Sequence, residues 1–75
     1  MLIGKIDLKS KQKILVTIRA VKGVQMIDVR VHTTSEEGEY VATPAGISLL
    51  PDQADHTIEL LKEARKRIGE QGNGG

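Results

Sequence analysis

Two stretches of the chain alternate apolar and polar residues, with room for only a tight turn between them. They are "KILVTIRAVK", residues 13–22, and "VQMIDVRVHT", residues 24–33. Successive side chains of a β-strand point to opposite faces of a sheet, so this period of two predicts neighbouring strands joined at Gly23. The residues on one side form what we call the apolar face: Ile14, Val16, Ile18, Ile27, Val29 and Val31. The residues on the other side form the polar face: Thr17, Arg19, Val21, Asp28, Arg30 and His32.

Two further extended stretches flank this pair, and a helical pattern follows. "LIGKIDL", residues 2–8, predicts a first strand, and "EYVATPAGISLL", residues 39–50, predicts a fourth strand bent at Pro44 and Gly46. The polar segments "SKQ" and "TSEEGE" supply the turns. After Pro51 the apolar residues recur at helical spacing. The stripe that they form consists of Ala54, Ile58, Leu61 and Ile68.

The ends of this helix carry recognisable signals. Pro51 suits the first helical position, where its missing N–H costs nothing, and Gly69 is the predicted C-terminal cap. Leu50 is a poor N-cap, so we expect its burial to fix the junction. The predicted fold class is α+β, a four-stranded curved antiparallel sheet followed by one C-terminal helix lying across the apolar face. We expect one domain over residues 1–68 and a disordered tail over 69–75.

A single helix is a thin cover for four strands in a chain of 75 residues. Small domains often add disulfides, a metal or a partner subunit. The chain has no cysteine, and its two histidines, His32 and His56, are not at metal-ligand spacing, so no metal or other cofactor is expected. We therefore expect a homodimer, in which two helices or two sheet edges cover each other.

The sequence also argues against several functional classes. It has no nucleophile motif, phosphate-binding glycine loop or paired carboxylate and histidine, so we do not expect an enzyme. No apolar run is long enough to cross a membrane, and Lys5 and Asp7 interrupt any signal-peptide core. A cytoplasmic protein is expected, associated with the nucleoid if the source is bacterial.

Charge is distributed unevenly along the chain. Residues 1–22 carry six basic side chains and one acidic one, whereas residues 23–61 carry one basic and seven acidic side chains. This asymmetry indicates either a basic binding face or solvated strand edges on which lysines discourage aggregation. The charge pattern alone favours the second interpretation.

Four short motifs between residues 16 and 53 add a family resemblance. They are "VTIRAVKG", "MIDVR", "EEGE" and "GISLLPDQ". Together they resemble the positive-cofactor-4 family of transcriptional coactivators, in its bacterial or phage form. The resemblance implies four antiparallel strands and a C-terminal helix, in a symmetric dimer that binds single-stranded DNA or melted duplex along its curved sheets.

The chain departs from that family where bases would be held. The family places aromatic residues at Val21 and at or near Thr33, and basic residues at Val24 and at the pair Pro44 and Ala45. Stacking of a base on a ring contributes about 1–3 kcal/mol, so these losses predict weaker binding. Of the usual contact set Arg19, Lys22 and Arg30 remain. The first-hairpin lysines, Lys9, Lys11 and Lys13, and the single aromatic residue, Tyr40, complete the predicted nucleic-acid-binding residues.

Two functions follow from the resemblance. The first is a dimer that binds single-stranded DNA or RNA weakly and without sequence preference, acting like a transcriptional coactivator beside transcription or replication proteins. The alternative is a dimeric protein-interaction module on the same fold, with DNA binding reduced or lost. Individual residues also have structural interpretations: Arg19 and Arg30 can pair with Asp28, and Tyr40 can be an ordinary strand residue.

Overall fold

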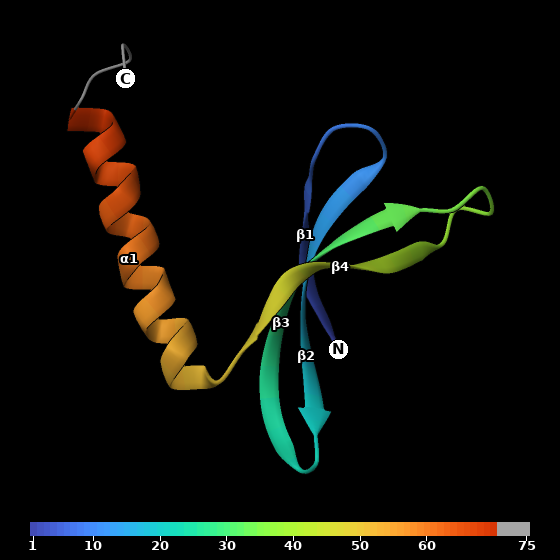
Figure 1. The fold of residues 1–75 in the computed structure, drawn as a ribbon, viewed down its shortest axis with the longest axis horizontal. Coiled ribbons are helices and arrows are strands. Elements are labelled where there is room, and N and C mark those ends of the chain that lie inside the picture. The colour runs from blue at the N-terminus through green and yellow to red at the C-terminus, as the bar shows by residue number, and fades with distance from the viewer. Residues whose placement is uncertain (71–75) are drawn as a thin grey trace.

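The computed structural model describes residues 1–70, which form four strands and one helix (Figure 1). The elements are β1 (Leu2–Asp7), β2 (Gln12–Val21), β3 (Val24–Thr34), β4 (Tyr40–Leu49) and α1 (Pro51–Glu70). The strands form one antiparallel sheet in the order β1-β2-β3-β4. The predicted fold class, an antiparallel sheet of four strands followed by one C-terminal helix, is confirmed.

The register of the strands confirms the two faces that the alternation predicted. The opposed pairs of the apolar face are Ile14 with Val31, Val16 with Val29, and Ile18 with Ile27. The edge strands extend this face, because Ile6 lies opposite Ile14 and Ile47 lies opposite Val29. On the polar face Thr17 lies opposite Asp28, and Ser48 of β4 lies on the other side of Asp28.

Each turn has the backbone geometry that its hairpin requires. In the β1–β2 turn Ser10 and Lys11 have φ values of 58° and 62°, and in the β2–β3 turn Lys22 and Gly23 have values of 52° and 81°. Two consecutive positive φ angles mark the type I′ turn, whose twist matches that of the flanking strands. The β3–β4 turn is longer and closes at Gly38, with φ 85°. The turns predicted from the sequence are therefore present.

β4 contains a bulge where the sequence predicted a bend. Arg30 lies opposite Gly46, but His32 lies opposite Ala42, so residues 43–45 face a single residue of β3. Beyond the bulge the two backbones come very close. A Cβ atom at position 46 would lie 2.6 Å from the Val29 carbonyl oxygen and 2.7 Å from Arg30 Cα. A glycine is required at this point because of the close approach.

The helix α1 leads away from the sheet and does not lie across its apolar face (Figure 1). Of its residues only Ala54 is buried, whereas Ile58 and Leu61 are 48% and 65% exposed. The prediction that the helix covers the sheet of its own chain is wrong. Only Leu50 separates β4 from α1, and a residue before proline favours an extended backbone, so the chain has no loop in which to turn back.

The strand–helix junction is held by a side-chain cap. The exposed Leu50 donates its N–H to Gln53 Oε1 at 2.9 Å, which is one half of a capping box. The Ala54 N–H donates to the Leu50 carbonyl oxygen at 2.9 Å and begins the helical ladder. The prediction that burial of Leu50 fixes the junction is therefore wrong.

The far end of the helix also differs from the prediction. The helix continues through Gly69 to Glu70, so Gly69 is a helical residue and not the cap. The remainder of the predicted disordered tail, residues 71–75, lies outside the described residues. Within residues 1–70, no helix combines the length and apolar character that crossing a membrane would require.

Candidate nucleic-acid interface

The polar face of the sheet curls inward around Leu15. The register sets Leu15 between Lys5 and Arg30, whose long aliphatic stems can cover an apolar neighbour. Leu15 is accordingly only 6% exposed. Lys5 on β1 also contacts Tyr40 on β4, although the edge strands of a flat four-stranded sheet lie about 14 Å apart. This contact across the sheet requires the polar face to be concave.

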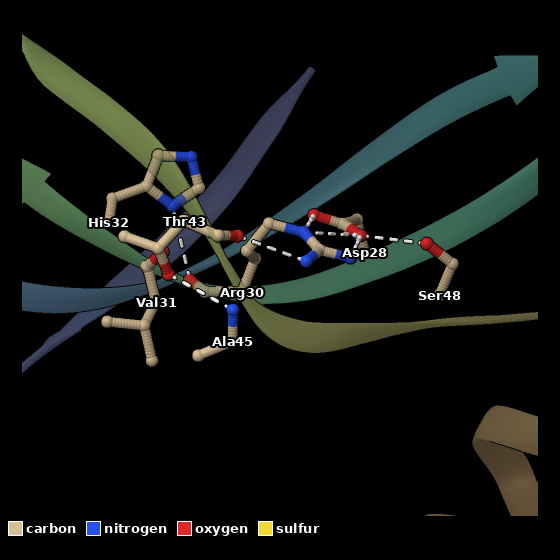
Figure 2. Close-up of polar contacts among 7 residues, drawn as sticks. All are labelled: Asp28, Arg30, Val31, His32, Thr43, Ala45 and Ser48. Carbon is tan, nitrogen blue, oxygen red and sulfur yellow. Dashed lines mark hydrogen bonds and ion pairs between the residues drawn. The ribbon is translucent and has the colours of Figure 1, made fainter.

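An ion pair lies in the middle of this concave face (Figure 2). Asp28 is 4% exposed and accepts hydrogen bonds from Arg30 Nε and Nη2, each at 3.1 Å, and from Ser48 Oγ at 2.8 Å. The hydrogen bond from Arg30 is the main cause that lowers the pKa of Asp28; burial opposes the shift, while Ser48, the Arg30 charge and Arg19 add to it. The pairing of Arg30 with Asp28, which the sequence left as one of two alternatives, is the arrangement observed.

The other side of the Arg30 guanidinium is tied to the bulge of β4 (Figure 2). Arg30 Nη1 donates to the Thr43 carbonyl oxygen at 3.1 Å. Thr43 Oγ1 donates to the Val31 carbonyl oxygen at 2.8 Å and accepts from the Ala45 N–H at 3.2 Å. Three of the five N–H groups of the guanidinium are thereby used, and one remains on each terminal nitrogen. Arg30 therefore holds strands together and has limited capacity for a phosphate.

Four of the other predicted cations belong to the two hairpin ends of the sheet, the β2–β3 turn and the β1–β2 connection, which lie at opposite ends in Figure 1. Lys22 forms the tip of the β2–β3 turn, and Arg19 precedes it on the polar face of β2; both are exposed. Lys9 and Lys11 lie in the β1–β2 connection at the opposite end and are also exposed. The structure thus spreads these cations along the sheet and does not gather them into one cluster.

Two further side-chain contacts on the polar face involve residues of the edge strand β1. Lys5 Nζ donates to Tyr40 Oη at 3.0 Å, and Lys13 of β2 forms an ion pair with Asp7 of β1. Their hydrogen bond is the main cause that lowers the pKa of Asp7 and raises the pKa of Lys13. The pair lies at the surface, where water screens it, so its contribution to stability is small. Of the predicted binding residues, Tyr40 is therefore held by Lys5, and Lys13 is paired with Asp7.

Three residues of this face were not singled out from the sequence. Ser48 and Thr43 fix the ion pair and the bulge, and Lys5 fixes Tyr40. For Ser48 a signal was available, because the alternation in "GISL" places it on the same face as Asp28. No local pattern could reveal the contact of Lys5 with Tyr40, since it joins residues 35 positions apart through the curl of the sheet.

The described part of the chain offers no clustered metal ligands. Among residues 1–70, no three histidine, aspartate or glutamate side chains lie close enough to hold a metal ion together. The polar face itself offers cations, hydrogen-bond donors and one phenol ring. These groups bind phosphates and bases.

Comparison with known proteins agrees with this architecture. Residues 8–60 match the family described as Transcriptional Coactivator p15 (PC4). No curated protein sequence matches the chain. Two crystal forms of BPSL1147, a PC4 homolog from Burkholderia pseudomallei K96243, are similar to this structure, with 28% sequence identity and TM-scores of 0.82 (orthorhombic) and 0.81 (tetragonal). The similarity covers 87% of this chain and 88% and 96% of those chains, respectively.

Proposed function

The chain belongs to the family of the transcriptional coactivator p15 (PC4), and on this premise we propose that it binds single-stranded nucleic acid along the polar face of its sheet. The observation that carries the proposal is the concave face itself, along which cations are exposed from one hairpin tip to the other. The proposed role is coactivator-like. The polar face offers groups that bind nucleic acid, and such a role requires no catalytic step.

Binding of this kind rests mainly on phosphates. Arg19 and Lys22 at one end of the sheet, and Lys9 and Lys11 at the other, are exposed enough to meet a sugar–phosphate backbone. Arg30 is a lesser contributor, because Asp28 and the Thr43 carbonyl group use most of its donors. Phosphate contacts carry no sequence information, so little preference between bases is expected.

The test is a titration of a fluorescent single-stranded oligonucleotide at several salt concentrations. The logarithm of the affinity should fall with the logarithm of the salt concentration by about 0.7 per neutralised phosphate. Replacing both Arg19 and Lys22 with Ala should flatten that slope by up to about 1.4 and weaken binding to all sequences alike. Arg30 is left intact in this variant, because its removal would leave the buried Asp28 carboxylate without its cationic partner.

A matched control is Arg67→Ala on α1. Arg67 is an exposed arginine that pairs with Glu63 on its own helix, away from the sheet. The Arg67→Ala variant should leave both the affinity for the oligonucleotide and the salt slope unchanged. A salt-independent affinity that is also insensitive to Arg19 and Lys22 would count against binding through this face.

We also propose that the protein acts as a homodimer. The apolar face of the sheet and the apolar stripe of α1 are both left open within a single chain (Figure 1). Contiguous apolar surfaces that a single chain leaves exposed are typical of protein interfaces. A second copy, which carries the same two surfaces, is the partner that they fit.

The alternative function is a dimeric protein-interaction module on the same fold. It is supported by the engagement of Arg30 with Asp28 and by the presence of a single aromatic residue in the chain. If no oligonucleotide binds even at low salt, the alternative is the function that remains.

A further inference from the structure

Tyr40 is the single aromatic residue of the chain, and it lies on the polar face. It begins β4, opposite Thr34 of β3, and remains 38% exposed. Its hydroxyl group is held by Lys5 from the far edge of the sheet, at 3.0 Å. An aromatic ring that is partly exposed and anchored at one end on a concave basic face has the properties of a stacking platform.

The position of the Lys5 ammonium leaves the ring itself accessible. Lys5 Nζ lies 3.0 Å from Tyr40 Oη but 5.2 Å from the ring centroid. These two distances place the ammonium beyond the hydroxyl end of the ring and not over its centre. Lys5 therefore fixes the direction of the ring without covering a face, and a flat base can still approach.

The ammonium group that anchors the ring can also meet a phosphate. A lysine ammonium carries three N–H donors, so Lys5 Nζ keeps donors beyond the one that it gives to Tyr40 Oη. Successive nucleotides present a base and then a phosphate, the two groups that a ring and a nearby cation recognise.

We infer that Tyr40, held by Lys5, is the base-stacking platform of a nucleotide subsite on the polar face, with Lys5 receiving the adjacent phosphate. This inference rests on the proposed function and specifies where a base, as distinct from a phosphate, is bound. A stacked base should tighten binding by about 5- to 150-fold.

The test compares a short oligothymidylate with an oligonucleotide of the same length whose central nucleotides lack bases. Both carry the same phosphates, so the ratio of their affinities measures stacking. Because Tyr40 is the single aromatic residue, intrinsic protein fluorescence reports on this site alone. We expect the oligothymidylate to bind about 5- to 150-fold more tightly and to quench the fluorescence, and the abasic strand to leave it nearly unchanged.

Variants at Tyr40 separate the ring from its hydroxyl group. Tyr40→Phe keeps the ring and should keep a preference for the strand with bases, measured by fluorescence anisotropy of labelled strands. Tyr40→Leu should bring the affinity ratio of the two strands close to one while the salt dependence persists. Circular dichroism checks that each variant is folded; if Tyr40→Leu is not, the comparison of the two strands on the unaltered protein decides alone.

A variant at Lys5 tests the anchor. Lys5→Met keeps an aliphatic stem beside Leu15 and removes the ammonium. It should lower the salt slope by about 0.7, because one phosphate contact is lost, and it should narrow the affinity ratio of the two strands, because the ring loses its anchor.

The outcomes distinguish this inference from the proposed function. Equal binding of the two strands by the unaltered protein overturns the stacking subsite and leaves the nucleic-acid function standing. If neither strand binds at low salt, both are overturned.

Discussion

At the scale of single residues, Asp28 combines a charge with near-complete enclosure, and it needs partners to be stable. Arg30 and Ser48 supply them, and the pKa of Asp28 is lowered chiefly by the hydrogen bond from Arg30. A carboxylate with a lowered pKa in the folded state stabilises the protein above its unfolded-state pKa and loses this contribution as the pH falls through the folded pKa. We therefore expect stability to decline as the pH falls below the ordinary value of 3.8.

Asp28→Asn tests this prediction. The variant keeps the size of the side chain but removes the charge that faces Arg30. It should lower the free energy of unfolding near neutral pH by about 1–3 kcal/mol and flatten its decline in acid, as measured by urea denaturation. Asp7→Asn is the matched control, because the pair of Asp7 with Lys13 is exposed and should matter little. Equal behaviour of the two variants would contradict the role given to burial.

Gly46 is a residue whose role is set by the backbone. Any Cβ atom would lie within 3 Å of three atoms of β3, two of them backbone atoms. Gly46→Ala should therefore lower stability by about 1–3 kcal/mol, because the strands must separate to accept it. In contrast, a Cβ atom at position 4 would meet no other atom within 4 Å, so Gly4→Ala is the control. Thermal melting of both variants, followed by circular dichroism, checks the difference.

The partner of Arg30 shows where prediction from the sequence ended at this scale. The position of Arg30 on the polar face followed from the alternation of residue types, and the register confirmed it. Whether Arg30 pairs with Asp28 or is free to bind a phosphate could not be predicted in this way. That depends on the Thr43 carbonyl group, which the bulge places against the guanidinium. The bulge is a property of how three residues of β4 meet one residue of β3, and residue types alone do not encode it.

At the scale of elements, the strands were predictable and the direction of the helix was not. Period-two alternation and turn residues such as Gly23 and Gly38 are local signals, and they placed all four strands. The apolar stripe of the helix is also a local signal, but it indicates only that this side of the helix packs against another surface, without saying which one. What covers it depends on the junction at Leu50, where the chain has no room to fold back.

The helix gives a prediction that depends on protein concentration. Leu61 is 65% exposed in the single chain, so Leu61→Ala should have little effect on stability where the chain is monomeric. Where two copies pack through the stripe, the same change should cost about 2–5 kcal/mol per buried side chain. Melting temperatures over a dilution series should therefore converge for the variant and the unaltered protein at low concentration. Glu59→Ala, on the charged side of the same helix, should follow the unaltered protein throughout.

At the scale of the whole molecule, the two faces of the sheet differ in how far a single chain buries their apolar side chains. On the polar face Leu15 is buried and Asp28 is paired with Arg30, so this face needs no second chain to cover an apolar side chain or to neutralise a buried charge. The apolar face is only half-buried, and an apolar groove on it is lined by Ile14, Val29, Val31 and Ile47 together with the bulge. In a single chain the polar face therefore has its side-chain contacts in place, whereas the apolar face is incompletely buried. We expect a second copy to pack against the apolar face.

The corresponding prediction concerns mass. Sedimentation or light scattering at micromolar concentration should give about twice the chain mass of 8.2 kDa. Dimerisation buries apolar surface that the single chain exposes, so the melting temperature should rise with protein concentration, as mass action requires. A molecule that remains monomeric at every concentration, with a constant melting temperature, would show that the open apolar face needs a different partner. In a dimer related by two-fold symmetry each copy contributes the same polar face, so binding of one long strand across both would be tighter than binding of two short ones.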